Sequence, residues 1–162
     1  MRKTDIDTII YNFDREDIPN FMLRINSFDA LLYHIPYIER LVRGSDSYAV
    51  WRKWNLVHEK AYIDSLENLD VSELDKTKIE LHHFPYTLYD IVQYVGLKLL
   101  DDKEETDPYE ITKIVCEEHL LGNIGYIPLL VTDHQKYHDG LIELEEELIK
   151  GKYKTFEYKY IK

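Results

Sequence analysis

The chain has a single cysteine, Cys116, among its 162 residues. One cysteine can form neither an internal disulfide nor a cysteine zinc knuckle, so a disulfide scaffold is excluded and a reducing cytoplasm is expected. Cys116 stands among the apolar residues Ile114, Val115 and Leu120. These neighbours favour a small core residue over a reactive thiol.

Long apolar runs are also missing, so the sequence predicts no membrane-spanning segment and no membrane partner. Residues 1–7 have no apolar core behind their basic residues, and we therefore expect no export signal. The six glycines match no phosphate-cradling loop. A composition of 44% hydrophobic and 31% charged residues is typical of a folded protein, and the length favours one domain over 1–162.

Positive charge is in short supply, with 20 Lys and Arg against 31 Asp and Glu and a net charge of −11. Residues 61–118 hold fifteen acidic and five basic side chains. Nucleic-acid affinity depends on local positive charge, whereas an acidic surface suits a protein partner. The tail from Lys150 to Lys162 has five lysines and one glutamate. It could track a nucleic-acid backbone or form a solvated edge strand.

The pattern of caps and apolar residues predicts an α+β fold that is mostly helical. Thr87 is expected to cap a helix, and Asp107 followed by Pro108 marks the start of the next helix. Short strands are expected at 78–83 and 124–131. A capping box from Thr132 to Gln135 predicts a short helix that ends at Gly140. Residues 141–149 read as helical and 153–161 as extended, and Pro36 is expected to break or restart an earlier helix.

One apolar stripe recurs at helical spacing after Ser47, formed by Val50, Trp54, Val57 and Ala61. Such a stripe, with Trp51 beside it, is most simply a buried face. Binding of a base or of a partner protein by the tryptophans is the alternative.

Four of the seven histidines fall into two tight pairs. His82 and His83 are adjacent in the first expected strand, where successive side chains point to opposite faces. His134 and His138 are four apart on a helix, so their rings share one face and can hold one ion. A strand histidine and this helical pair would give three nitrogen ligands with an open position, and the other strand histidine would face solvent and substrate.

These segments resemble the HNH family of endonucleases, also called ββα-metal or His-Me finger nucleases. The residues Ile79-Glu80-Leu81-His82-His83 with Pro85 resemble the first strand and loop of that family. The stretch from Asn123 to Gly140 resembles its second strand and helix. The chain is most similar to the His-His type of the colicin DNases and to small phage-encoded HNH proteins. The resemblance implies HNH-like elements at 78–87 and 122–140, separated by a helical insertion at 88–121.

The resemblance implies metal-dependent hydrolysis of phosphodiester bonds in DNA within the bacterial host cytoplasm. His83 would be the general base, and Asn123 would brace its loop. One divalent metal ion (Zn, Mg, Mn or Ni) would be bound by His82, His134 and His138. These roles suit a histidine that titrates near neutral pH and a metal that acts as a Lewis acid.

Two other functions stay open. The first is an HNH-fold metal-binding protein without nuclease activity, acting as a regulatory or protein-binding module through its acidic surface. The second is a small metallohydrolase with a different substrate. The presence of His83 favours the nuclease, because a structural site needs a fourth ligand and no spare base. His119 is a candidate for that fourth ligand, or else a residue that contacts the last carbonyls of its helix.

Overall fold

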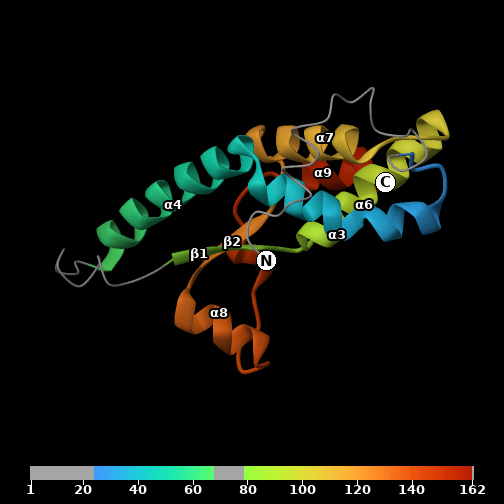
Figure 1. Cartoon of the computed structure of the whole chain (residues 1–162). Helices are drawn as coiled ribbons and strands as arrows, with labels where there is room; N and C mark the ends of the chain where they lie inside the picture. The colour runs from blue at the N-terminus through green and yellow to red at the C-terminus, as the bar shows by residue number, and fades with distance from the viewer. Residues whose placement is uncertain (1–23, 68–78, 162) are drawn as a thin grey trace.

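The computed structural model describes residues 24–67 and 79–161, which are mostly helical and include a small two-stranded sheet (Figure 1). The predicted α+β fold is therefore confirmed. The elements are, in order, α3 (Phe28–Gly44), α4 (Asp46–Glu67), β1 (Ile79–His83), α6 (Leu88–Lys103), α7 (Pro108–Leu120), β2 (Tyr126–Leu130), α8 (Val131–His138), the 3-10 turn η1 (Glu146–Leu148) and α9 (Tyr153–Tyr160). Among the described residues, no helix is long and apolar enough to cross a membrane.

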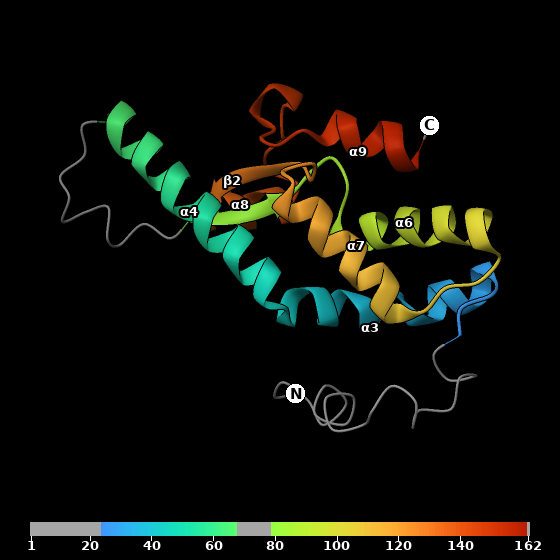
Figure 2. The same ribbon diagram turned by 90° about the horizontal axis from the view of Figure 1, so that it is seen from above.

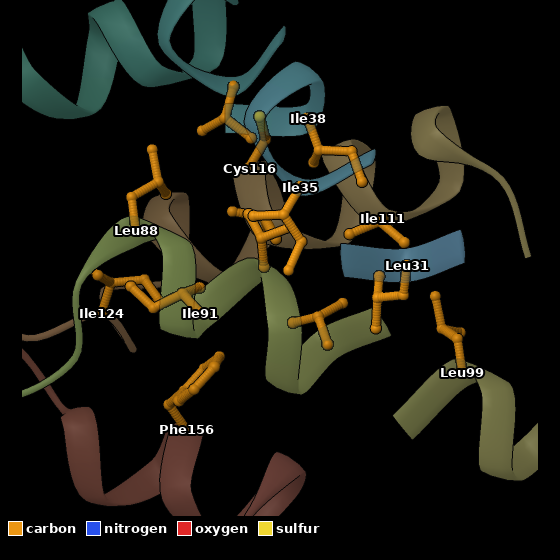
Figure 3. Packing of buried hydrophobic residues seen from close by; sticks show 14 of the residues in the cluster. Leu31, Ile35, Ile38, Leu88, Ile91, Leu99, Ile111, Cys116, Ile124 and Phe156 are labelled. Atoms are coloured by element: carbon orange, nitrogen blue, oxygen red, sulfur yellow. The ribbon is translucent and has the colours of Figure 1, made fainter. Parts of the chain in front are cut away.

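The hydrophobic core lies between α3, α6 and α7, and α9 closes one side of it (Figure 3). Helices α3 and α6 approach closely at Gly96, where a Cβ atom would lie 2.4 Å from Cδ1 of Leu31. Phe156 of α9 is fully buried against this core. The core residues are Leu31, Ile35, Ile38, Val42, Leu88, Ile91, Val92, Val95, Leu99, Ile111, Val115, Cys116, Ile124 and Phe156, together with Ile25.

Two helix starts follow the sequence signals. Thr87 accepts a hydrogen bond from the Asp90 backbone, and the Asp90 carboxylate accepts one from the Thr87 backbone, which completes a capping box. Asp107 caps α7 by accepting from the backbone of Tyr109 and Glu110. Pro36, in contrast, does not break its helix, because α3 continues from Phe28 to Gly44 with Ile35 and Ile38 buried on either side of the proline.

The two strands form an antiparallel ribbon in which His82 lies opposite Ile127 and His83 opposite Tyr126. Helices α6 and α7 leave the ribbon after β1 and return to it at β2 (Figure 2). Helix α8 begins directly after β2, without a loop. The ribbon begins at Ile79, and Lys78 lies outside the described residues.

Four further local predictions were wrong. Residues 141–149 form a loop with a single 3-10 turn, and residues 153–160 form α9 instead of an extended edge. The expected capping box does not start α8, which begins at Val131 with Leu130 as its N-cap residue and without a side-chain cap. The stripe on α4 is also turned outward, because Trp51 is buried while Val50, Trp54 and Val57 are exposed.

Candidate metal centre

Three imidazoles from two elements converge at one point of the molecule. His82 comes from β1, and His134 and His138 come from α8. One ring nitrogen of each lies within 4.8 Å of the others. The Nε2 atom of His134 is 3.0 Å from Nδ1 of His82 and 3.0 Å from Nε2 of His138. The structure thus brings together the three residues that the sequence suggested as ligands.

The chain builds this cluster by local means. His134 and His138 are one helical turn apart and so share a face of α8. Because α8 follows β2 directly and β2 pairs with β1, this face lies over the strand that carries His82. Tyr137 packs edge-on against the His82 ring at 4.9 Å between centroids. The antiparallel pairing therefore joins residues that are 52 positions apart in the sequence.

Glu80 completes the cluster, although the sequence analysis did not single it out. Its carboxylate contacts the Nδ1 atom of His134. The protonated Nδ1 of His134 then donates a hydrogen bond to the Glu80 carboxylate. The lone pair on Nε2 of His134 is left pointing toward the other two rings. Carboxylates that bond a ligand histidine in this way fix its tautomer and raise its basicity. The sequence did contain a signal that could have identified Glu80. Side chains two positions apart on a strand lie on the same face, so Glu80 is on the face that carries His82.

The donor set fits a transition-metal cation. Burial and, to a smaller extent, the neighbouring His134 and His138 together lower the pKa of His82 to about 4. An imidazole with a low pKa is neutral at pH 7, which is the form that binds metal. His82 and His134 are half-buried while His138 is exposed, so the cluster opens to solvent on one side. Three nitrogen donors with an open position match the ligand pattern of zinc and similar ions.

His83 points away from this cluster, toward α4 and α7. Its ring stacks on Trp51 with centroids 5.5 Å apart and an angle of 14°. Its Nε2 atom lies 3.0 Å from Nε2 of His119, whose Nδ1 atom is 2.8 Å from the carbonyl of Val115. This geometry makes His119 a donor to Val115 and an acceptor from His83. His83 was expected to face solvent and substrate, but it is only partly exposed and its Nε2 is engaged.

His119 and Asn123 serve other parts of the fold. Burial lowers the pKa of His119 to about 4. Its Nε2 atom contacts His83, so His119 lies away from the three-histidine cluster and does not provide the fourth ligand there. Asn123 is 6% exposed and donates from Nδ2 to Glu118 at 2.6 Å. Glu118 also accepts from Lys159 and Tyr160 of α9, each at 2.9 Å. Asn123 therefore belongs to the network that joins α7 to α9.

Comparison with known proteins corrects the expected function. A family model described as bacteriophage G278-like virion protein matches residues 3–162. No curated protein and no solved structure matches the chain. A virion family points to a structural role, so the expected endonuclease and hydrolase activity is wrong, and the catalytic roles given to His83 and Asn123 lose their basis. The expectation of a phage-encoded protein is supported, and this chain belongs to the bacteriophage G278-like virion protein family.

Proposed function

We propose that the chain is a structural component of a phage particle in which a divalent metal ion holds α8 against the ribbon. The virion family match over residues 3–162 is the observation that carries the structural role. The convergence of His82, His134 and His138 supports the metal site. Synthesis and assembly in the cytoplasm of the bacterial host are part of the proposal.

The chemistry of the donors narrows the choice of metal. Neutral imidazoles suit zinc, nickel, copper and cobalt, whereas magnesium prefers oxygen ligands and retains its water. Glu80 provides a carboxylate, but it contacts His134 and is turned to support that ring. Zinc or nickel is therefore preferred over magnesium and manganese, with water or a neighbouring subunit at the fourth position.

A metal at this place would stabilise a short helix. Helix α8 has eight residues and no side-chain cap at its N-terminus. A helix this short is unstable by itself in water. Two of the three proposed ligands lie on α8 and the third on β1, so one ion would link the two elements directly.

The structural role is tested on the particles themselves. Phage purified on a density gradient should contain the chain in the band of intact particles, at a constant ratio to the other particle proteins, by quantitative mass spectrometry. Detection only in the soluble fraction of the lysate would overturn the structural role.

The metal site is tested on the purified chain by titration with Zn²⁺ and by elemental analysis after dialysis. We expect one ion per chain in the wild type and at least tenfold weaker binding in His138→Ala. His58→Ala is the matched control, because His58 is also exposed on a helix but stacks on Trp54 outside the cluster. Equal binding by wild type and His138→Ala, or none by the wild type, would contradict the site.

A further inference from the structure

The outward-facing stripe on α4 is an exposed apolar surface. Val50, Trp54 and Val57 are 60%, 65% and 59% exposed. They recur at the spacing of one helix face, and the His58 ring lies against the Trp54 ring with centroids 4.3 Å apart. Single exposed apolar residues are ordinary, but a contiguous row that includes tryptophan is typical of an interaction site.

The stripe borders a pocket of about 630 Å³, here called the Trp54 pocket. It lies between α4, the C-terminal end of α7 and Gly151–Lys152, where Figure 2 shows α4 beside α7. Its rim carries the apolar side chains of Leu120 and Leu121, which are 53% and 61% exposed. The buried ring of Trp51 is also part of its lining. The pocket therefore has the shape and chemistry to receive apolar side chains.

A lysine is part of the lining of this pocket, although the whole chain is acidic. Lys152 lines the pocket, and Lys53 flanks the stripe on the neighbouring face of α4. Within residues 24–67 and 79–161, neither lysine forms an ion pair. An apolar pocket lined by Lys152, with Lys53 beside the adjoining stripe, suits a segment that combines leucines with carboxylates.

This chain carries such a segment in the loop between α8 and α9. Residues 141–148, Leu-Ile-Glu-Leu-Glu-Glu-Glu-Leu, are called the acidic strip. Leu141 and Leu148 are 73% and 48% exposed, and all four glutamates are exposed. None of these eight residues lines the Trp54 pocket of its own chain. An occupant with this sequence would therefore come from another copy.

We propose that the Trp54 pocket of one copy receives the acidic strip of a second copy. This inference rests on the proposed structural role and names its partner. The exposed leucines of the strip enter beside Trp54, Leu120 and Leu121. Glu143, Glu145 and Glu147 meet Lys53 and Lys152, whereas Glu146 is held by Tyr153 and Lys154 of its own chain. Both halves of the contact are present on every chain, so a single type of subunit can use it to associate with itself.

Sedimentation velocity of the purified full chain tests the contact without reference to phage particles, so its failure is separate from failure of the structural role. We expect the wild type to associate as its concentration rises, with a Kd in the range of ~1–100 μM. Trp54→Glu should raise the Kd about tenfold or more, since the anchor is lost. Tyr33→Glu is the matched control, because Tyr33 is an aromatic residue 82% exposed on α3, outside both surfaces.

Charge reversal identifies the partner surface. Lys152→Glu and Glu145→Lys should each weaken association, and an equimolar mixture of the two should recover it, because opposite charges then face each other again. Asp101→Lys, an exposed change of the same size on α6, should not weaken association. A wild type that is monomeric throughout, a Trp54→Glu variant that associates like the wild type, or a mixture without recovery would overturn the proposal. Similar far-UV circular dichroism of all variants checks their folding.

Discussion

At the scale of single residues, Glu80 is the position whose role depends most on the presence of a metal. It contacts His134 rather than the point where the three rings converge. Glu80→Gln should therefore leave the three ligands in place and weaken zinc binding about 10–100-fold, measured by competition with a chromogenic chelator. Asp133→Asn, which removes the same charge from the first turn of α8, should bind zinc like the wild type. Equal affinities of wild type and Glu80→Gln would exclude the supporting role.

His119 makes the free energy of unfolding depend on pH. Burial lowers its pKa in the folded state to about 4 from an ordinary value of 6.5. Below pH 6.5 the unfolded chain binds a proton that the folded chain refuses, so this part of the stability is present above pH 6.5 and lost as the pH falls toward 4. The loss by pH 4 is on the order of 3 kcal/mol.

Urea unfolding at pH 7 and at pH 4.5 measures this dependence. His119→Gln removes the titrating group and should flatten the pH profile relative to the wild type, even if its stability at pH 7 is lower. His58→Gln, at an exposed position on α4, should keep the wild-type slope. Parallel profiles for wild type and His119→Gln would show that another group controls the acid response.

At the scale of elements, Glu118 joins α9 to α7. Burial raises the pKa of Glu118, but hydrogen bonds from Lys159, Asn123 and Tyr160 outweigh this and bring it below the ordinary value. Glu118→Ala should cost about 2–3 kcal/mol in urea unfolding, because Asn123 would be left buried without its partner. Glu117→Ala changes the preceding residue, which is exposed and makes only a surface ion pair, and should cost less than about 0.5 kcal/mol. Similar losses for the two variants would contradict the network.

Helix α8 is the element that should respond to metal. The side chains proposed to hold α8 against the ribbon are the metal ligands themselves. Zinc at 100 times its Kd would therefore stabilise the folded, ribbon-bound state of α8 by about 2.7 kcal/mol. Hydrogen exchange of the α8 amides should then slow about 100-fold, while exchange in α6 stays unchanged. Equal protection of the α8 amides from hydrogen exchange in zinc and in a chelator would contradict this prediction.

The elements also show what the sequence could predict. The caps at Thr87 and Asp107 are local signals, and both helices begin where these signals place them. The lysine-rich tail was expected to be extended. Instead, Phe156, Glu157 and Tyr160 share one helical face that packs on the core and on Glu118. Whether the stripe of Val50 and Trp54 or the ring of Trp51 would be buried depends on how α4 meets α7, which no local pattern encodes.

At the scale of the whole molecule, the site was easier to predict than its use. The spacing of His82, His134 and His138 anticipated their convergence, because strand pairing and helix periodicity are fixed geometries. The same few residues can serve an enzyme or a structural protein, since a fold does not determine a function. The family match extends over nearly the whole chain and corrected the nuclease that two short segments had suggested.

Net charge should govern how copies of the chain associate. Each copy carries −11, so two copies repel over distances that depend on salt. The Debye length falls from about 30 Å at 0.01 M to about 8 Å at 0.15 M, which screens this repulsion more than it weakens the close apolar contact at Trp54. Association of the wild type should therefore tighten over this range in sedimentation velocity, while Trp54→Glu associates more weakly than the wild type at both salts. Weaker association of the wild type at 0.15 M would mean that the pairing of Lys53 and Lys152 with glutamates dominates over the net charge.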